Sequence, residues 1–382
     1  MPTNSDCFDE GNFYALLRFQ EAADALRICF ELELVESLGG DSLQWESLCD
    51  RFGVTTQGAR TFGYLLVSMK VLEWIDPTKP DLGLRVTELA EHVLGVASLQ
   101  SRLPYLSMGS SDSTRELIKM LQGDFEAKPL YVDAANDDCL MESVATENVA
   151  REIAYGLASR AKNFAEPLAG LISRSLNDRP IVNESENLVL ADLGAGSPYV
   201  AIACLRRQHE RMSAVLVDQA AGLNFAREMY NEIQSPKPPL GFLESNIFEQ
   251  VPKANHYLLS NTVHDWLPHQ CVRLFKNISA AASERLTITI HEPMLSPGNP
   301  TPHDQWDSLW KSCYGLTLYK LTGGQGRCYT LGEHVSMLKQ AGFLQACQPE
   351  ATSDGCLAVD FQRKELVRQQ RTHFSRADSE DL

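Results

Sequence analysis

The spacing of apolar residues changes near residue 187. Before that point apolar residues recur every three or four positions, as at Leu16, Phe19 and Ala23, which is the spacing of one helix face. After it, short apolar runs of strand length alternate with stretches of helical spacing. Such alternation is typical of a parallel sheet with helices on both faces. The sequence therefore predicts an α-rich N-terminal part followed by an α/β domain.

The N-terminal part predicts three helices and a β-hairpin. Asp41 or Ser42 is expected to cap the second helix and Gly53 to end it. The stretch after the third helix, "VLEWIDPTKPDLGLRVTE", predicts two short strands around a turn. Three helices and a hairpin are the elements of a winged helix, a fold that often binds DNA. The third helix offers only Arg60 and Lys70 as cations, so a DNA-recognition role is not expected.

Composition narrows the class of protein. With 44% hydrophobic and 22% charged residues the chain is typical of a globular protein, and its net charge of -16 disfavours nucleic-acid and anionic-membrane partners. The polar start predicts no signal peptide, and no apolar stretch is long enough for a transmembrane helix. The ten cysteines lack CxxC spacing, so free thiols are expected. A cytoplasmic location is predicted.

Four segments are predicted along the chain. The polar stretch "SRSLNDRPIVNESEN" marks the main boundary, and the charged C-terminus is expected to fray. The helical segment before the boundary is expected to cover the mouth of a substrate pocket. The predicted segments are a winged-helix domain at 1–100, a helical connector and lid at 101–180, an α/β domain at 181–365 and a polar tail at 366–382.

A glycine-rich turn, "VLADLGAGSPYVA", carries the first candidate chemistry. Gly194 and Gly196 separate a predicted strand from a helix, where backbone N–H groups and the helix dipole meet a ligand. A dinucleotide site would need a third glycine at the position of Tyr199. Asp192 would repel a pyrophosphate, but it suits a cation such as the sulfonium and amino groups of S-adenosylmethionine.

The next two strand ends add candidate nucleotide contacts. Asp218 ends the second strand, where a carboxylate accepts both hydroxyls of a ribose. This feature occurs in NAD and S-adenosylmethionine proteins alike, so it does not distinguish them. Asn246 and Ile247 follow the third strand, and we expect them to lie beside an adenine.

The fourth and fifth strand ends carry the candidate proton-transfer residues. His264 and Asp265 follow the fourth strand at the edge where open α/β sheets bind ligands. A histidine there takes a proton from a substrate hydroxyl, although a purely structural hydrogen bond is the alternative. Glu292 follows the fifth strand and is expected to orient the His264 imidazole.

A later helix offers a candidate pocket wall. Trp310, Tyr314 and Leu318 recur every four residues, which indicates either core packing or one wall of an apolar substrate pocket. Val144 and Asn148, from the helical segment before the boundary, are expected to line the same pocket.

Six motifs occur in an ordered set: "LADLGAGSP", "LVDQ", "SNIFEQVP", "LLSNTVHDW", "HEPML" and "GGQGRCYTLGEHVSMLKQAGF". In order and spacing the chain resembles the class I O-methyltransferases that have an N-terminal winged-helix dimerisation domain. The resemblance covers roughly residues 15–365. It is closer to the bacterial natural-product enzymes than to the plant enzymes.

The resemblance implies a Rossmann-like, mostly parallel sheet with flanking helices, and S-adenosylmethionine as the cofactor. It also implies a homodimer formed through the N-terminal domain, a small-molecule substrate of secondary metabolism and no metal ion. Its implied catalytic residues are His264 as general base, Asp265 beside it and Glu292 as support. The implied cofactor contacts are Asp192, Gly194, Gly196, Asp218, Asn246, Ile247 and Ser260.

The chain departs from the family pattern at three places. Pro198 replaces the last glycine of D-x-G-x-G-x-G, Asn246 replaces an aspartate, and Gln325 to Arg327 stand where plant enzymes carry a second supporting glutamate. Pro198 and the missing second glutamate keep open a relative that binds the cofactor without donating its methyl group, such as a pericyclase, decarboxylase or hydroxylase. A winged-helix regulator and a dehydrogenase are the remaining alternatives.

Overall fold

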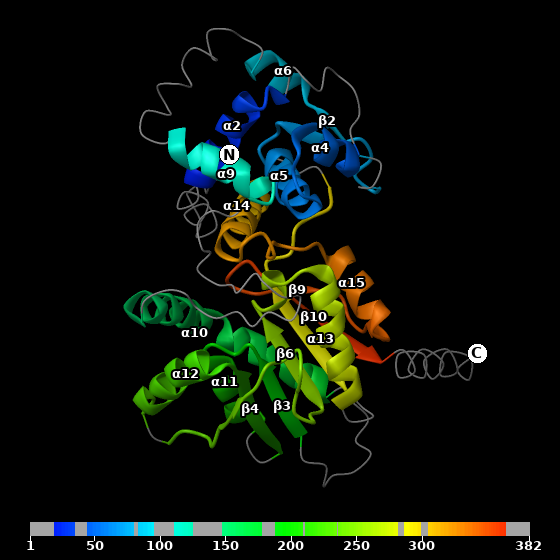
Figure 1. The fold of residues 1–382 in the computed structure, drawn as a ribbon. Coiled ribbons are helices and arrows are strands. Elements are labelled where there is room, and N and C mark those ends of the chain that lie inside the picture. Colours follow the sequence, from blue (N-terminus) through cyan, green and yellow to red (C-terminus); the bar gives the residue numbers. More distant parts are fainter. Residues whose placement is uncertain are drawn as a thin grey trace, which may run out of the picture. The chain divides into compact units, whose positions relative to one another are not determined.

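The computed structural model divides the 382-residue chain into two compact units (Figure 1). The helical unit comprises residues 1–134 and 294–331, and the sheet unit comprises residues 135–293 and 332–382. Residues 294–331, which the sequence places in the α/β domain, thus join the helical unit. The residues described are 19–34, 44–79, 83–94, 111–124, 147–177, 188–208, 211–234, 236–281, 286–298 and 305–363.

The helical unit contains the predicted helices and hairpin. Its first elements are α2 (Phe19–Glu31), α4 (Trp45–Phe52), α5 (Thr56–Ser68) and the antiparallel pair β1 (Leu72–Trp74) and β2 (Leu84–Val86).

Local chemistry explains where α4 and α5 begin and end. Gly53 ends α4 at φ 64°, as predicted, because a left-handed residue there favours glycine. The Oγ1 atom of Thr55 accepts from Gly58 N at 3.0 Å and caps α5. The helix α4 starts at Trp45 without a side-chain cap, and the predicted caps Asp41 and Ser42 lie outside the described residues.

The described residues of this unit form three further helices: α6 (Glu88–Leu94), α9 (Ser111–Leu121) and α14 (Gln305–Leu321). The helix α14 packs on α5 and α2. Tyr319 of α14 is buried, and its hydroxyl donates to Met120 O at 2.9 Å and lies 3.1 Å from Thr55 Oγ1. These contacts explain why α14 belongs to the helical unit although it follows the sheet strands in sequence.

The sheet unit has the predicted, mostly parallel sheet. The strand order is β5-β4-β3-β6-β7, all parallel, followed by the antiparallel β10 and its neighbours β8 and β9. The chain order reverses between β3 and β6, which is where open α/β sheets bind ligands. The strands are β3 (Leu188–Leu193), β4 (Met212–Asp218), β5 (Gly241–Glu244), β6 (His256–Ser260), β7 (Thr287–Glu292), β8 (Phe343–Gln345), β9 (Glu350–Ala351) and β10 (Leu357–Arg363).

Helices flank the sheet on both sides. In Figure 1, α10, α11 and α12 lie to one side of the labelled strands and α13 and α15 to the other. The helix α10 runs through the first five residues of the predicted linker, because its buried Leu168, Ile172 and Leu176 continue the helical spacing. The helices are α10 (Glu147–Asn177), α11 (Tyr199–Gln208), α12 (Ala220–Glu232), α13 (Pro268–Ala281) and α15 (Leu331–Gln340).

Two predictions from composition are met in the described ranges. None of the helices described is both long and apolar enough to cross a membrane. Each cysteine in the same ranges is a free thiol, and most of them are buried. The predicted polar tail lies outside the described residues.

Candidate active site

The two candidate loops of the sheet unit meet at one edge of the sheet. Strands β3 and β6 are parallel neighbours, with Asp192 opposite Leu258, so the turns that follow them lie side by side. The hydroxyl of Thr262 donates to Leu193 O at 3.1 Å. A Cβ atom on Gly194 would lie 2.8 Å from the Thr262 methyl carbon. Thr262 therefore joins the glycine turn to the loop that carries the candidate base.

The glycine turn forms despite Pro198. Gly194 and Gly196 adopt φ +66° and +54°, the left-handed region that glycine enters without strain. Pro198 immediately precedes α11, and its carbonyl accepts from Ile202 N at 3.0 Å. A proline at the start of a helix loses no helical hydrogen bond, because the first N–H groups have no partner within the helix. The substitution is thus compatible with the turn.

Asp192, at the end of β3, is buried with 3% of its surface exposed. Burial raises the pKa of its carboxyl group well above the usual value, and the charge of Asp218 adds to this. Within the described part of the chain, no hydrogen bond or ion pair reaches its side chain. A buried carboxylate is costly unless it is paired. The position therefore suits a cationic ligand that supplies the missing partner.

Asp218 has two backbone partners. Its carboxylate accepts from Gly196 N at 3.0 Å and from Gln219 N at 2.7 Å. Burial raises its pKa, although the two hydrogen bonds act in the opposite direction. A Cβ atom on Gly222 would lie 2.7 Å from the carboxylate, so this glycine is required for the side chain to lie against α12. Sequence reasoning missed Gly222, since only the fold brings it to Asp218.

Asn246 closes the turn that follows β5. Its side-chain oxygen accepts from Phe248 N at 3.0 Å, and its carbonyl accepts from Glu249 N and Gln250 N at 2.9 Å. Ile247 beside it is buried. The cofactor role of both residues stays a prediction, and the turn-forming role of Asn246 is an addition from the structure.

His264 and Glu292 form the buried pair that the sequence predicts. His264 lies in the short 3-10 turn Val263–Asp265, and its Nδ1 is 2.5 Å from Glu292 Oε2. The other carboxylate oxygen of Glu292 accepts from Thr262 N at 2.9 Å and Val263 N at 2.8 Å. Because the carboxylate accepts the Nδ1 proton, the imidazole presents Nε2 as its basic nitrogen.

In the His264–Glu292 pair the charged form of each side chain is favoured. Burial by itself lowers the pKa of His264, but the charges of Glu292 and Asp265 outweigh it and the net pKa is raised. Burial by itself raises the pKa of Glu292, yet the charge and hydrogen bond of His264 lower it overall. Asp265 Oδ1 lies 3.6 Å from His264 Nε2, and burial raises the pKa of Asp265 to about 6. The site thus favours a protonated histidine between carboxylates.

The strand end before His264 is held in an unusual conformation. Ser260 Oγ lies 2.8 Å from His291 Nδ1, a contact that the sequence did not indicate. Asn261 adopts φ +53°, which costs on the order of 1 kcal/mol for a residue other than glycine. The side-chain oxygen of Asn261 is buried without a hydrogen-bond partner in the described residues. The predicted cofactor contact of Ser260 stays a prediction.

The predicted pocket residues lie on α14 and α10. Trp310 and Tyr314 have ring centroids 6.3 Å apart, and Leu318 is buried in the core of the helical unit. Core packing, the alternative raised from the sequence, therefore holds for Leu318. Asn148 lies in α10, and Val144 falls outside the described residues. Their role in a pocket stays a prediction.

The segment that replaces the second glutamate is anchored within the helical unit. Gln57 Nε2 donates to Gln325 O at 2.8 Å, and Arg327 Nε donates to Gln57 Oε1 at 3.1 Å. Arg327 is buried, and its guanidinium lies 4.2 Å from the centre of the Tyr329 ring. These residues have a local structural role in place of the glutamate of plant relatives.

Parts of the chain are similar in sequence to known O-methyltransferases. Residues 182–344 match the family described as the O-methyltransferase domain. O-methyltransferase 7 of Dictyostelium discoideum is 27% identical over 29% of this chain and 31% of its own length. Acetylserotonin O-methyltransferase of Bos taurus is 26% identical over 41% of this chain and 42% of its own length. The matched stretches thus span less than half of these relatives.

A solved structure extends the likeness of fold to nearly the whole chain. An O-methyltransferase family 2 protein from Planctomyces limnophilus, in complex with apigenin, superposes with a TM-score of 0.72 at 23% identity. The superposition covers 94% of this chain and 97% of that protein. The chain thus matches an O-methyltransferase domain over residues 182–344 and shares its fold with this structure over nearly its whole length.

Proposed function

We propose that the protein transfers a methyl group from S-adenosylmethionine to a hydroxyl oxygen of a small molecule. The observation that carries this proposal is the buried Asp192 carboxylate, which has no partner within the described residues and lies beside the loop of the His264–Glu292 pair. One strand end offers a site for a cation, and its neighbour offers a base. Methyl transfer from a sulfonium donor to a hydroxyl needs both.

The residues of the glycine turn fit this cofactor. Asp192 would hold its positively charged methionine end, and Gly194 and Gly196 leave the backbone open to close approach. Asp218 would accept from the ribose hydroxyls, and Asn246 and Ile247 would border the adenine. When bound, S-adenosylmethionine supplies an electrophilic methyl group on a sulfonium sulfur. Dinucleotides fit poorly, because a pyrophosphate would meet the Asp192 carboxylate.

His264 performs the proton transfer. Its Nε2 would accept the proton that the substrate hydroxyl loses when it is methylated, so the imidazole would become a cation, and the cofactor would leave as the neutral thioether S-adenosylhomocysteine. The proton on Nδ1 stays on the imidazole throughout and is accepted in a hydrogen bond by Glu292, which with Asp265 stabilises the cation that forms. General-base assistance of this kind contributes roughly 10²- to 10⁴-fold in rate, and the rest comes from positioning.

The proposal extends to the substrate class, the assembly and the location of the protein. The aromatic Trp310 and Tyr314 favour an aromatic or polyketide-like hydroxyl compound of secondary metabolism. The three helices and hairpin of the helical unit suit a winged helix that forms a homodimer. The charge of -16 favours a protein that binds neither nucleic acid nor anionic membranes, in the cytoplasm.

The test measures both cofactor binding and methyl transfer. Native mass spectrometry of the purified protein is expected to show bound S-adenosylmethionine or its demethylated product. Incubation with methyl-labelled cofactor and a panel of phenols, starting with flavones, is expected to label one phenol and release S-adenosylhomocysteine. The His264→Ala variant serves as the inactive control and the surface variant Glu350→Gln as the active one. Tight cofactor binding without release of S-adenosylhomocysteine would instead assign a non-methylating reaction.

A further inference from the structure

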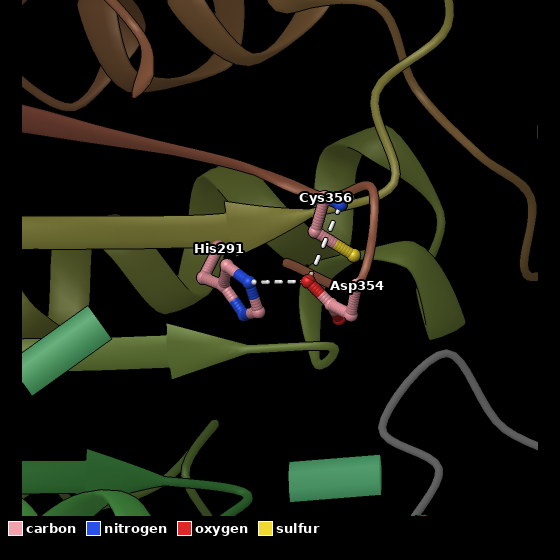
Figure 2. Close-up of side chains that lie close together, drawn as sticks. All are labelled: His291, Asp354 and Cys356. Atoms are coloured by element: carbon pink, nitrogen blue, oxygen red, sulfur yellow. Dashed lines mark hydrogen bonds and ion pairs between the residues drawn. The ribbon is translucent and has the colours of Figure 1, made fainter. Parts of the chain in front are cut away.

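A second cluster of titratable side chains lies next to the end of β6, the strand that leads to His264. Figure 2 shows His291, Asp354 and Cys356 pointing toward one another from β7 and the loop before β10. Their ligand-type atoms all lie within 4.8 Å of one another. His291 and Cys356 are fully buried. A histidine, a carboxylate and a thiol at this separation resemble a metal site, so the cluster needs an explanation.

The surroundings of the cluster argue against a metal ion. The guanidinium of Arg160, from α10, lies 3.1 Å from Asp354 Oδ2 and 3.2 Å from Cys356 Sγ. This cation already occupies the position at which a metal would bridge the two residues. Burial also raises the pKa of the Cys356 thiol well above its usual value, which disfavours the thiolate that metals bind. The cluster is a hydrogen-bonded network with its own internal cation.

The network reaches the active site through His291. Its Nε2 lies 2.9 Å from Thr352 Oγ1, its Nδ1 lies 2.8 Å from Ser260 Oγ, and its carbonyl accepts from Asn261 N at 2.9 Å. Because successive side chains of a strand point to opposite faces, His291 and Glu292 leave β7 on opposite sides. His291 holds the end of β6 on one side while Glu292 holds the amides of Thr262 and Val263 on the other.

Asp354 orients this histidine. Its Oδ1 accepts from Thr352 Oγ1 at 2.7 Å and lies 3.5 Å from His291 Nε2. Burial by itself raises the pKa of Asp354, but the hydrogen bond and charge of His291, together with Arg160, lower it strongly. The ring of Phe164, also from α10, packs on His291 with centroids 4.5 Å apart. The imidazole is therefore fixed in position and orientation.

We propose that His291, oriented by Thr352 and Asp354, is a positioning residue that holds the Ser260–Thr262 strand end and thereby aims His264. Asn261, between Ser260 and Thr262, has a left-handed backbone. Such a conformation persists only if the residues on both sides are fixed, so the strand end needs this restraint. The importance of the network for turnover rests on the proposed methyl transfer. The restraint on the strand end does not depend on methyl transfer, so either proposal can fail without the other.

Hydrogen–deuterium exchange tests the restraint without any substrate. Thr352→Val keeps the shape of the side chain and removes the hydroxyl that joins His291 to Asp354, whereas Thr352→Ser retains it. We expect Thr352→Val to speed amide exchange in the peptide covering 260–265 by about tenfold, because the hydrogen bonds of the hydroxyl with His291 and Asp354 are lost, and Thr352→Ser to restore the slow exchange. Asp354→Asn is expected to act in the same way as Thr352→Val.

Two controls complete the design. Glu350, on the nearby β9, forms an exposed ion pair with Arg174 of α10. Glu350→Gln removes this pair and is expected to leave exchange in the 260–265 peptide unchanged. The dissociation constant of S-adenosylhomocysteine is expected to change less than about threefold in Thr352→Val, while kcat for any accepted phenol falls about tenfold at unchanged KM. Unchanged exchange in the 260–265 peptide of both Thr352→Val and Asp354→Asn, with each variant folded, would overturn the proposal.

Discussion

Asp192 and Glu292 are both buried carboxylates at the carboxyl ends of strands in one sheet, yet their pKa values move in opposite directions. Glu292 accepts two backbone amides and the His264 imidazole, so its ionised form is stabilised and its pKa is lowered. Asp192 has no such partner within the described ranges, and burial raises its pKa. The described residues thus supply partners for the carboxylate of Glu292 and none for that of Asp192.

This difference shows that burial alone does not define the role of a carboxylate. A buried charge that is fully hydrogen-bonded serves to orient a neighbour, here the proton-bearing Nδ1 of His264. A buried charge without partners is held at a cost that a cationic ligand offsets. The predictions below test each half of this contrast.

Removing the base has the largest expected effect. His264→Ala deletes the group that takes the hydroxyl proton, so kcat is expected to fall roughly 10²- to 10⁴-fold. Cofactor affinity is expected to change little, because the glycine turn is untouched. Steady-state kinetics with the accepted phenol and calorimetric titration of S-adenosylhomocysteine measure the two effects. Turnover at the wild-type rate would show that another group acts as base.

Glu292→Gln changes the tautomer rather than the shape. The amide nitrogen would donate to Nδ1, which forces the imidazole proton onto Nε2 and blocks its use as a base. A loss of kcat approaching that of His264→Ala is expected, on the order of 10³-fold or more. Circular dichroism checks that the variant folds. A loss below tenfold would mean that Glu292 holds the loop but does not set the tautomer.

Asp192→Asn tests the ligand half of the contrast. We expect affinity for S-adenosylhomocysteine to fall roughly 10- to 100-fold, as for a lost charge-assisted hydrogen bond. The melting temperature of the cofactor-free protein is expected to hold or rise, since the neutral amide removes an unpaired buried charge. In the wild type, affinity is expected to increase with pH, because binding needs the ionised carboxylate and its pKa is raised. A variant with unchanged affinity would reassign Asp192.

A matched pair of glycine variants tests how closely the two loops are packed. Gly194→Ala places a Cβ atom 2.8 Å from Thr262 at φ +66° and is expected to lower the free energy of unfolding by about 2 kcal/mol. Gly196→Ala has a similar φ of +54° but open space, so a loss of about 1 kcal/mol is expected. Urea unfolding distinguishes them, and equal losses would show that the contact with Thr262 does not matter.

The smallest expected effect is a shift in the pH profile. The base must be neutral to act, so kcat/KM is expected to rise with pH and reach its midpoint above 6.5, because Glu292 and Asp265 raise the pKa of His264. Asp265→Asn removes one of these charges and is expected to move the midpoint to lower pH. An upward shift in this variant would contradict the electrostatic account.

Much of the site was predictable because its key residues follow strand ends. The alternation of apolar runs and helical spacing marks each strand, and the carboxyl ends of parallel strands meet at one edge. Glu292 was predicted to lie beside His264 on this basis, and the two side chains are in contact, while its role in orienting a base stays a prediction. Gly222 and His291 were not predicted, since each acts on a residue brought near only by the folded chain.

Two elements differ from the sequence prediction for a related reason. The helix α10 continues into the polar stretch taken for a linker, because a stripe of buried residues on one face suffices for a helix. The helix α14 joins the helical unit, where Tyr319 bonds to residues far away in sequence. Local composition carries no information on which distant surface an amphipathic helix covers.

By itself the sequence determined the alternation of strands and helices, the glycine turn, and the positions of Asp192, His264 and Glu292 at or just after strand ends. Each of these features depends on neighbours within a few positions. Only the tertiary structure decided which buried groups have partners: Ser260 with His291, Asp218 with Gly196, and Asp192 with none in the described residues. The pairing of polar groups depends on strand order and side-chain direction. These are set by the packing of the whole sheet.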